Sequence, residues 1–352
     1  MIQKKNITII GSGSRVSKVV LPALCKINNL NINQIVSINH LKLLKVVELK
    51  RNFQTVKFKD IDIDKVDLIY LAVRPNSISQ ILKRLTNSFD VSEKILIVDT
   101  PPIHFFNVFK LNLFKKFKSS YVLEDIPFTP VNLEISKIIK SNQIGKIKRI
   151  NLFNNAFFYH GFSQIKRFLD VNSFDLIIWV KIYKIHRRIV FYSGLDQVAN
   201  IYEPKDYGIG RTQIIGTFGD INDFDMHIEL NEYNNFTINH NIKNHQYLGV
   251  SIFKNKKLYF EKKFKEVFKL DKDIKDKLQI YNIQKSLGIM NFFQLILDQP
   301  DLKEKDIKLY TVKEALYDYL ITYFLKFKII VDFKLPFFKK SLINLFIDLL
   351  FI

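Results

Sequence analysis

The sequence predicts two domains: an α/β domain with a doubly wound parallel sheet, followed by an α+β domain with a large, mainly antiparallel sheet. Over the first 150 residues, short apolar runs alternate with helical stretches, which is typical of a parallel sheet covered by helices on both faces. From about residue 146, polar and apolar residues alternate instead. That alternation indicates half-buried antiparallel strands.

Within the first domain, apolar runs bounded by turn residues predict strands, and the stretches between them carry apolar residues at helical spacing. The predicted strands cover residues 6–10, 34–38, 66–73 and 94–98, and the predicted helices cover 14–28, 41–53 and 77–85. Pro22 falls inside the first helix, and we expect it to kink or loosen that helix because proline removes a helical hydrogen bond.

The second domain is predicted from the alternating runs and the helical stretches that flank them. Its strands are expected at 146–154, 188–193, 225–230, 236–240 and 257–261, and its helices at 131–141, 164–184, 286–297 and 311–328. We place the domains at residues 1–125, 126–328 and 329–352. The last segment is apolar and predicts a C-terminal helix packed on its own core, with a dimer contact or an interfacial membrane anchor as alternatives.

The composition excludes several classes of protein. One cysteine leaves no disulfide scaffold or thiolate zinc cluster, and no apolar stretch is long enough to span a bilayer. The formal net charge is +20, but only nine of the 54 basic residues are arginine and the charges are spread along the chain. That distribution favours a lysine-rich coding bias over a nucleic-acid surface. We expect a cytoplasmic protein without a leader, a metal ion or a nucleic-acid partner.

The most specific motif is a glycine turn, GSGSRV at 11–16, between the first predicted strand and helix. Gly11 allows the tight turn, and Gly13 has no Cβ, so a diphosphate can approach the backbone where the helix begins. Val16 replaces the third glycine of the G-x-G-x-x-G fingerprint. We predict a dinucleotide site here, with a purely structural turn as the alternative. The predicted ligands of the diphosphate are Gly11, Gly13, Ser14 and Arg15.

The end of the second strand bears on which nicotinamide dinucleotide binds. An NAD site usually offers a carboxylate there to the ribose hydroxyls. This chain instead reads SINH at 37–40, followed by Lys42. No carboxylate would repel a 2′-phosphate, and Lys42 would attract one. The predicted cofactor is NADP or NAD, with NADP favoured and with Asn39 and Lys42 close to the ribose.

Several segments, taken in order, resemble the Gfo/Idh/MocA family of oxidoreductases, which pair a Rossmann domain with an α+β domain. The glycine turn is followed by LPAL (21–24), residues 66–82 resemble the family's third strand and Pro-Asn loop, and residues 94–102 resemble its Glu-Lys-Pro strand end. Later segments at 122–150, 211–220 and 290–326 continue the likeness. The resemblance implies cofactor contacts from Ala72, Val73, Arg74, Pro75 and Asn76, and from Asp99, Thr100 and Pro101.

The chain departs from that family where the chemistry is expected. The family's lysine in Glu-Lys-Pro would stabilise developing alkoxide charge, but Thr100 stands in its place and supplies only a neutral hydrogen bond. The family's helical histidine corresponds to Asn172, with Asp175 as the second acid of that motif, and an amide cannot shuttle protons. His160 is the candidate substitute shuttle, with a loop histidine of no catalytic role as the alternative.

The predicted function is therefore a NAD(P)-dependent oxidoreductase that transfers a hydride to or from a small polar substrate. The resemblance alone implies that this substrate is a sugar or nucleotide-sugar derivative and that the protein is a homo-oligomer. The competing hypothesis is a non-catalytic relative that keeps the fold and the nucleotide site and acts as a sensor or assembly protein.

Overall fold

The computed structural model describes residues 4–38, 42–47, 49–102, 105–154, 158–169, 176–182, 187–193, 197–203, 211–223, 233–243, 246–269, 278–298, 309–324 and 333–334. The chain divides into two compact units, which we describe separately. The first includes Met1–Phe128 and Lys285–Tyr323, and the second includes Thr129–Gln284. We expected residues 126–328 to form one domain, whereas residues 285–323 lie in the first unit.

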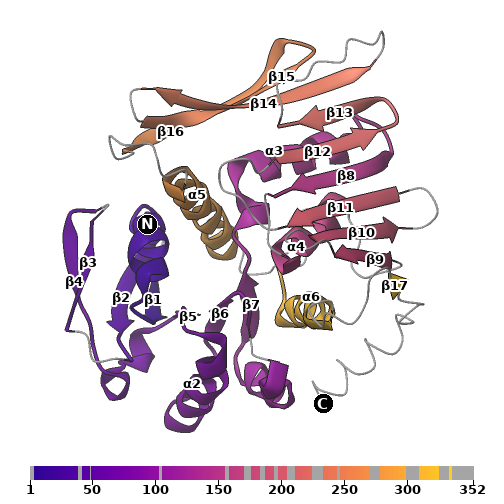
Figure 1. Ribbon diagram of the computed structural model, residues 1–352. Coiled ribbons are helices and arrows are strands. Elements are labelled where there is room, and N and C mark those ends of the chain that lie inside the picture. The colour runs from indigo at the N-terminus through magenta and orange to yellow at the C-terminus, as the bar shows by residue number, and fades with distance from the viewer. Residues whose placement is uncertain are drawn as a thin grey trace. The chain divides into compact units, whose positions relative to one another are not determined.

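The first unit is built on a five-stranded parallel sheet in the order β2-β1-β5-β6-β7 (Figure 1). Its strands are β1 (Lys5–Ile10), β2 (Leu30–Val36), β5 (Leu68–Leu71), β6 (Ile95–Asp99) and β7 (Ser119–Leu123). The apolar residues of β1, β5 and β6 are almost fully buried, because helices cover both faces of such a sheet. The predicted parallel sheet is confirmed. Its edge strand β7 was not predicted, since its first residues are polar.

The first helix runs without a break over residues 14–24. It contains a π-helical stretch, η1 (Val16–Val20), followed by α1 (Leu21–Leu24). Pro22 has no N–H to donate to the carbonyl four residues before it. Just ahead of it, the Leu21 N–H bonds the Val16 carbonyl, five residues back, which is π-helical spacing. The disturbance that we predicted at Pro22 therefore takes the form of a π turn.

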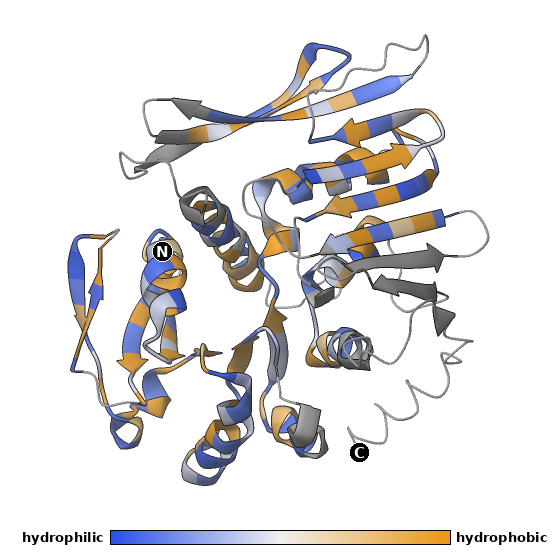
Figure 2. Ribbon diagram, in the orientation of Figure 1, coloured by the Kyte–Doolittle hydropathy of each residue, from blue (hydrophilic) through white to orange (hydrophobic). Residues whose placement is uncertain are grey.

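Helix α2 (Pro75–Ser88) connects β5 to β6 and is amphipathic, as its mixed colouring in Figure 2 shows. Its buried side carries Ile78, Ile81, Leu82 and Leu85. Short 3₁₀ segments complete the connections of this unit: η2 (Phe58–Asp60), η3 (Ile63–Lys65), η4 (Phe105–Lys116) and η5 (Ile126–Phe128).

The helix predicted at 41–53 is wrong. This segment forms a separate two-stranded hairpin of β3 (Leu43–Val46) and β4 (Arg51–Gln54). Leu44 and Val46 are buried, whereas Leu43 and Lys45 are exposed, so the buried residues repeat every second position, as in a strand. Lys50 closes the turn with a positive φ of 50°, a conformation that an α-helix does not contain.

Two late helices contribute to the first unit. They are α5 (Leu278–Leu297), which enters this unit at Lys285, and α6 (Val312–Phe324). The Ser286 hydroxyl donates to the Val19 carbonyl at 3.0 Å, which ties α5 to the first helix. Further along α5, the Phe293 ring packs edge to face on Tyr70 of β5, with 6.1 Å between ring centroids. These late residues therefore complete the core of the parallel-sheet unit.

The second unit contains a ten-stranded sheet in the order β16-β15-β14-β13-β12-β8-β11-β10-β9-β17. Neighbouring strands are antiparallel except for β8 with β11 and β13 with β14, which confirms the predicted, mainly antiparallel sheet. The strands are β8 (Ile147–Phe153), β9 (Leu176–Ile182), β10 (Arg187–Ser193), β11 (Gln197–Glu203), β12 (Arg211–Gly216), β13 (Gly219–Asn222), β14 (Asn234–Lys243), β15 (Gln246–Lys254), β16 (Lys257–Lys269) and β17 (Phe333–Lys334). The helices are α3 (Pro130–Lys140) and α4 (Phe158–Leu169).

The two faces of this sheet differ in chemistry around its centre. On one face Ile150 and Ile214 pair in register and are fully buried. On the other face three amides lie in one row across β11, β8 and β12. Asn200 donates to the Asn151 side-chain carbonyl, and Asn151 donates to that of Gln213, both at 2.8 Å. We call this row the amide ladder.

Helix α4 packs on β8 and β11, and Gly161 permits the close contact, because a Cβ there would lie 2.6 Å from the Ile201 side chain. The helix predicted at 164–184 is wrong over residues 176–182, which form β9 and pair with β10. The run LIIWV has the apolar residues of a helix, but it is also rich in β-formers, and apolar runs do not separate the two. The strand predicted at 225–230 and most of the tail at 329–352 lie outside the described residues.

Candidate functional site

The glycine turn lies at the carboxyl end of β1, where the sequence predicts it. Gly11 has a φ of +130°, and a Cβ at this position would lie 2.2 Å from the Ala72 carbonyl oxygen, so only glycine fits between β1 and the end of β5. At Gly13, by contrast, a Cβ would meet nothing within 4 Å. The turn is thus closed on the protein side and open on the outer side, where the first amides of the helix have no helical partner.

The end of β2 approaches this turn. The Ser12 and Ser37 hydroxyls are 3.0 Å apart, which joins the turn to the strand that in a dinucleotide fold lies beside the adenosine half. Lys42 is exposed, as a contact to a ribose phosphate requires. Asn39 lies outside the described residues.

The end of β5 carries the segment that the resemblance implies for cofactor contacts. The Ala72 N–H bonds the Ile10 carbonyl at 2.9 Å, which holds the segment against β1. Arg74 is the N-cap residue of α2, Pro75 begins that helix, and Arg74 and Asn76 are exposed. Val73, which precedes Arg74, is partly exposed. The structure therefore brings this segment to the same sheet edge as the glycine turn.

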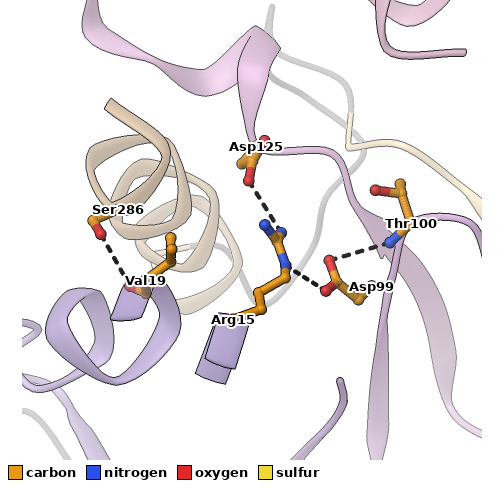
Figure 3. Close-up of polar contacts among 6 residues, drawn as sticks. All are labelled: Arg15, Val19, Asp99, Thr100, Asp125 and Ser286. Atoms are coloured by element: carbon orange, nitrogen blue, oxygen red, sulfur yellow. Dashed lines mark hydrogen bonds and ion pairs between the residues drawn. The ribbon is translucent and has the colours of Figure 1, made fainter. Parts of the chain in front are cut away.

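A buried ion-pair cluster occupies the ends of β6 and β7 (Figure 3). The Arg15 guanidinium contacts Asp99 through Nε, and Nη2 donates to the Asp125 carboxylate at 3.0 Å. The second oxygen of Asp99 accepts the backbone N–H of Thr100 at 3.2 Å. The Arg15 and Asp125 side chains are 28% and 1% exposed. We call Arg15, Asp99 and Asp125 the strand-end triad.

The carboxylates of this cluster contribute to shifts in the pKa values of Arg15 and the neighbouring Tyr70. Burial lowers the pKa of Arg15, but the carboxylates of Asp99 and Asp125 outweigh burial and raise that pKa well above its usual value. Burial, and then the Asp99 charge, raise the pKa of the fully buried Tyr70 well above its usual value. At neutral pH the Arg15 guanidinium is charged and the Tyr70 phenol is neutral.

The remaining predicted residues are distributed as follows. Thr100 and Pro101 follow β6, are partly buried, and are joined by a cis peptide bond. His160 lies in the first turn of α4 in the second unit and is 8% exposed, so it is neither an exposed loop histidine nor at the end of a strand. Asn172 and Asp175 lie outside the described residues, beyond the end of α4.

Two polar residues with buried contacts, Asp125 and His240, were not predicted from the sequence. Asp125 was not singled out, because β7, the strand that it follows, was not predicted. His240 on β14 was also missed. Its Nδ1 is 3.5 Å from the Gln284 side-chain nitrogen, and its Nε2 is 3.9 Å from an Asp223 oxygen. Burial, and then the charge of Arg211, lower the pKa of His240 to about 4.

Within the described ranges, no group of three or more His, Cys, Asp or Glu residues is arranged to hold a metal ion. Among the same residues, no helix is both long and apolar enough to cross a membrane.

Comparison with known proteins identifies the fold. No family model matches the sequence, and no curated protein matches it. Solved structures do match over most of their length. A dehydrogenase (MviM) from Clostridium difficile is 17% identical with a TM-score of 0.58, covering 92% of this chain and 99% of its own. A putative myo-inositol dehydrogenase from Sinorhizobium meliloti 1021 is 10% identical with a TM-score of 0.60, covering 89% and 93%.

A third match is KijD10, a 3-ketoreductase from Actinomadura kijaniata, solved in complex with TDP-benzene and NADP. It is 13% identical with a TM-score of 0.53, covering 90% of this chain and 95% of its own. The chain thus has the two-domain fold of the Gfo/Idh/MocA-type dehydrogenases, and the resemblance that we inferred from its motifs is confirmed at the level of the fold.

Proposed function

We propose that this protein is a NAD(P)-dependent oxidoreductase whose first unit holds the cofactor across the carboxyl ends of β1, β5 and β6. The observation that carries the proposal is the asymmetry of the glycine turn. Gly11 is required by its contact with Ala72, whereas Gly13 faces open space. Packing does not explain the absence of a side chain at Gly13, but a diphosphate seated on the helix amides does.

The residues present fit a nicotinamide dinucleotide. The turn from Gly11 to Arg15 would take the diphosphate, the end of β2 would face the adenosine half, and residues 72–76 and 99–101 would face the nicotinamide half. When bound, the cofactor supplies hydride transfer at its ring. The substrate proposed is a small polar alcohol or ketone of the sugar class, in keeping with the inositol dehydrogenase and the 3-ketoreductase among the structural matches.

Thr100 defines what the chain itself contributes at the ring. Its hydroxyl offers a neutral hydrogen bond beside the cofactor, and Asp99 fixes its backbone. A neutral donor stabilises developing charge less than an ammonium group does, so we propose a slower hydride transfer than the family's lysine would support. His160 remains the candidate proton shuttle that the sequence suggests.

The test is dinucleotide binding by the Gly13→Ala variant. The added methyl group meets no protein atom within 4 Å, so the free energy of unfolding should stay within about 0.5 kcal/mol of wild type. It does stand where the diphosphate would approach, so the Kd for NADPH, measured by calorimetry, should rise at least about tenfold.

Ser17→Ala is the matched control, because it alters the same helix one turn further along. Unchanged binding in Gly13→Ala would contradict the proposal. Titration of wild type with both NADPH and NADH tests the preference for NADP, which Lys42 motivates. Firm binding without turnover on a panel of sugars and ketoses would favour the non-catalytic alternative.

A further inference from the structure

We infer that Arg15 is a positioning residue, not a ligand of the diphosphate: it clamps the ends of β6 and β7 to the glycine turn and so sets the nicotinamide half of the site. The inference rests on the proposed function. It also differs from the expectation that Arg15 binds phosphate, which followed from its place in the turn.

The first step is the direction of the guanidinium. In Figure 3 the Arg15 side chain points from the first helix toward Asp99 and Asp125, and it contacts both carboxylates. A planar guanidinium forks between two acceptors in a way that a lysine cannot. Its Nε and Nη2 groups are therefore directed at carboxylates inside the unit.

The second step is what the carboxylates hold. Asp99 ends β6, and its other oxygen accepts the N–H of Thr100. Asp125 follows β7 and is almost completely buried. Arg15 therefore connects three segments that are remote in sequence: the glycine turn, the Thr100 segment and the end of β7. No backbone hydrogen bond between the turn and the end of β6 is found among the described residues.

The third step places the effect within the cofactor site. The diphosphate would bind at the end of β1, and the nicotinamide half would reach the ends of β5 and β6, since the sheet order is β1-β5-β6. Releasing Asp99 would let the Thr100 segment move, and this segment would contact only the nicotinamide half. The adenosine half and the diphosphate would keep their contacts with the turn and with β2.

The experiment compares a complete dinucleotide with one that lacks the nicotinamide ring. The probes are NADPH with 2′-phospho-ADP-ribose, or NADH with ADP-ribose, whichever pair wild type binds more tightly. The variants are Asp125→Asn, which keeps the shape of the side chain, and Arg15→Lys, which keeps the charge but not the fork. Ser286→Ala is the matched control, because it removes the buried hydrogen bond from α5 to Val19, which lies on the same helix as Arg15.

If Arg15 is a positioning residue, both variants should raise the Kd for the complete dinucleotide about tenfold and change the Kd for the ring-free probe by less than about twofold. Ser286→Ala should bind both probes with Kd values near those of wild type. If Arg15 instead binds the phosphates, Asp125→Asn should strengthen the binding of both probes, because the guanidinium is freed from one carboxylate. Arg15→Lys should then weaken the binding of both probes.

Either that second pattern, or wild-type binding of both probes by both variants, overturns the inference. If wild type binds neither the complete dinucleotide nor the ring-free probe, the proposed function fails and the inference fails with it.

Discussion

The two units each contain a polar network among buried side chains, and the two networks are built from opposite chemistry. The strand-end triad of the first unit is ionic, with one guanidinium between two carboxylates. The amide ladder of the second unit is neutral, and so is His240, since its pKa of about 4 leaves the imidazole uncharged at neutral pH. The triad lies where strands end and loops begin, whereas the ladder lies in the middle of a continuous sheet.

This difference indicates what each network stabilises. Ions are costly to bury, and they are retained where their geometry fixes something else, here the segments that we assign to the cofactor. Amides satisfy one another across neighbouring strands without a net charge and favour one register of the sheet. The comparison can be tested by breaking each network in turn.

The largest expected effect comes from Arg15→Met. Asp99 and Asp125 would lose the cation between them, and breaking a buried pair by removing one partner typically costs about 3–5 kcal/mol. Urea denaturation at pH 7 should show that the free energy of unfolding falls by about that amount. Arg15→Lys should lower it less, because the lysine keeps the positive charge. A decrease below about 1 kcal/mol would mean that the triad is solvated like a surface pair.

The next effect is the dependence of stability on acid. The pKa of His240 is lowered from 6.5 to about 4, so the folded state holds the proton less readily than the unfolded state. The contribution of neutral His240 to the free energy of unfolding is complete above pH 6.5. It is lost as the pH falls toward 4, and the total loss is about 3 kcal/mol. His240→Gln should remove this part of the acid sensitivity. The same slope in the variant and in wild type would show that carboxylates alone cause it.

The smallest effect is expected from the amide ladder. Asn151→Ala removes the hydrogen bonds to both Gln213 and Asn200 and should lower the free energy of unfolding by about 2 kcal/mol. Because all three groups are neutral, this decrease should be equal at pH 6 and pH 8. If the ladder acts as a unit, the double variant Asn151→Ala, Asn200→Ala should lose less free energy of unfolding than the two single variants lose together.

The sequence was most informative where one physical signal dominated. The buried strands β1, β5 and β6 are mostly apolar, and the glycine turn follows β1 directly, so the parallel sheet and the position of the turn were both predictable. The hairpin β3–β4 was not, because leucine, valine and lysine at 42–50 suit a helix as well as a strand. Its period of two residues becomes clear only once Leu44 and Val46 are seen to be buried.

The part of the candidate site at the ends of β6 and β7 was less predictable, for a physical reason. Arg15 belongs to the motif, but its partners Asp99 and Asp125 are 84 and 110 residues away in the chain, and no spacing rule links them. Only the order of strands brings β6 and β7 to the same edge as the turn. The role of His160 in catalysis likewise stays a prediction, as do those of Asn172 and Asp175.

The contacts of Ser286 and Phe293 with residues near the amino terminus have a consequence for biosynthesis. While the ribosome is still making the middle of the chain, Tyr70 and Val19 lack the partners that later cover them. The parallel sheet therefore matures only after more than 280 residues have been translated, whereas most of the second unit, residues 129–284, has been translated before that point. A fragment cut at residue 128 would present an uncovered aromatic core to the solvent.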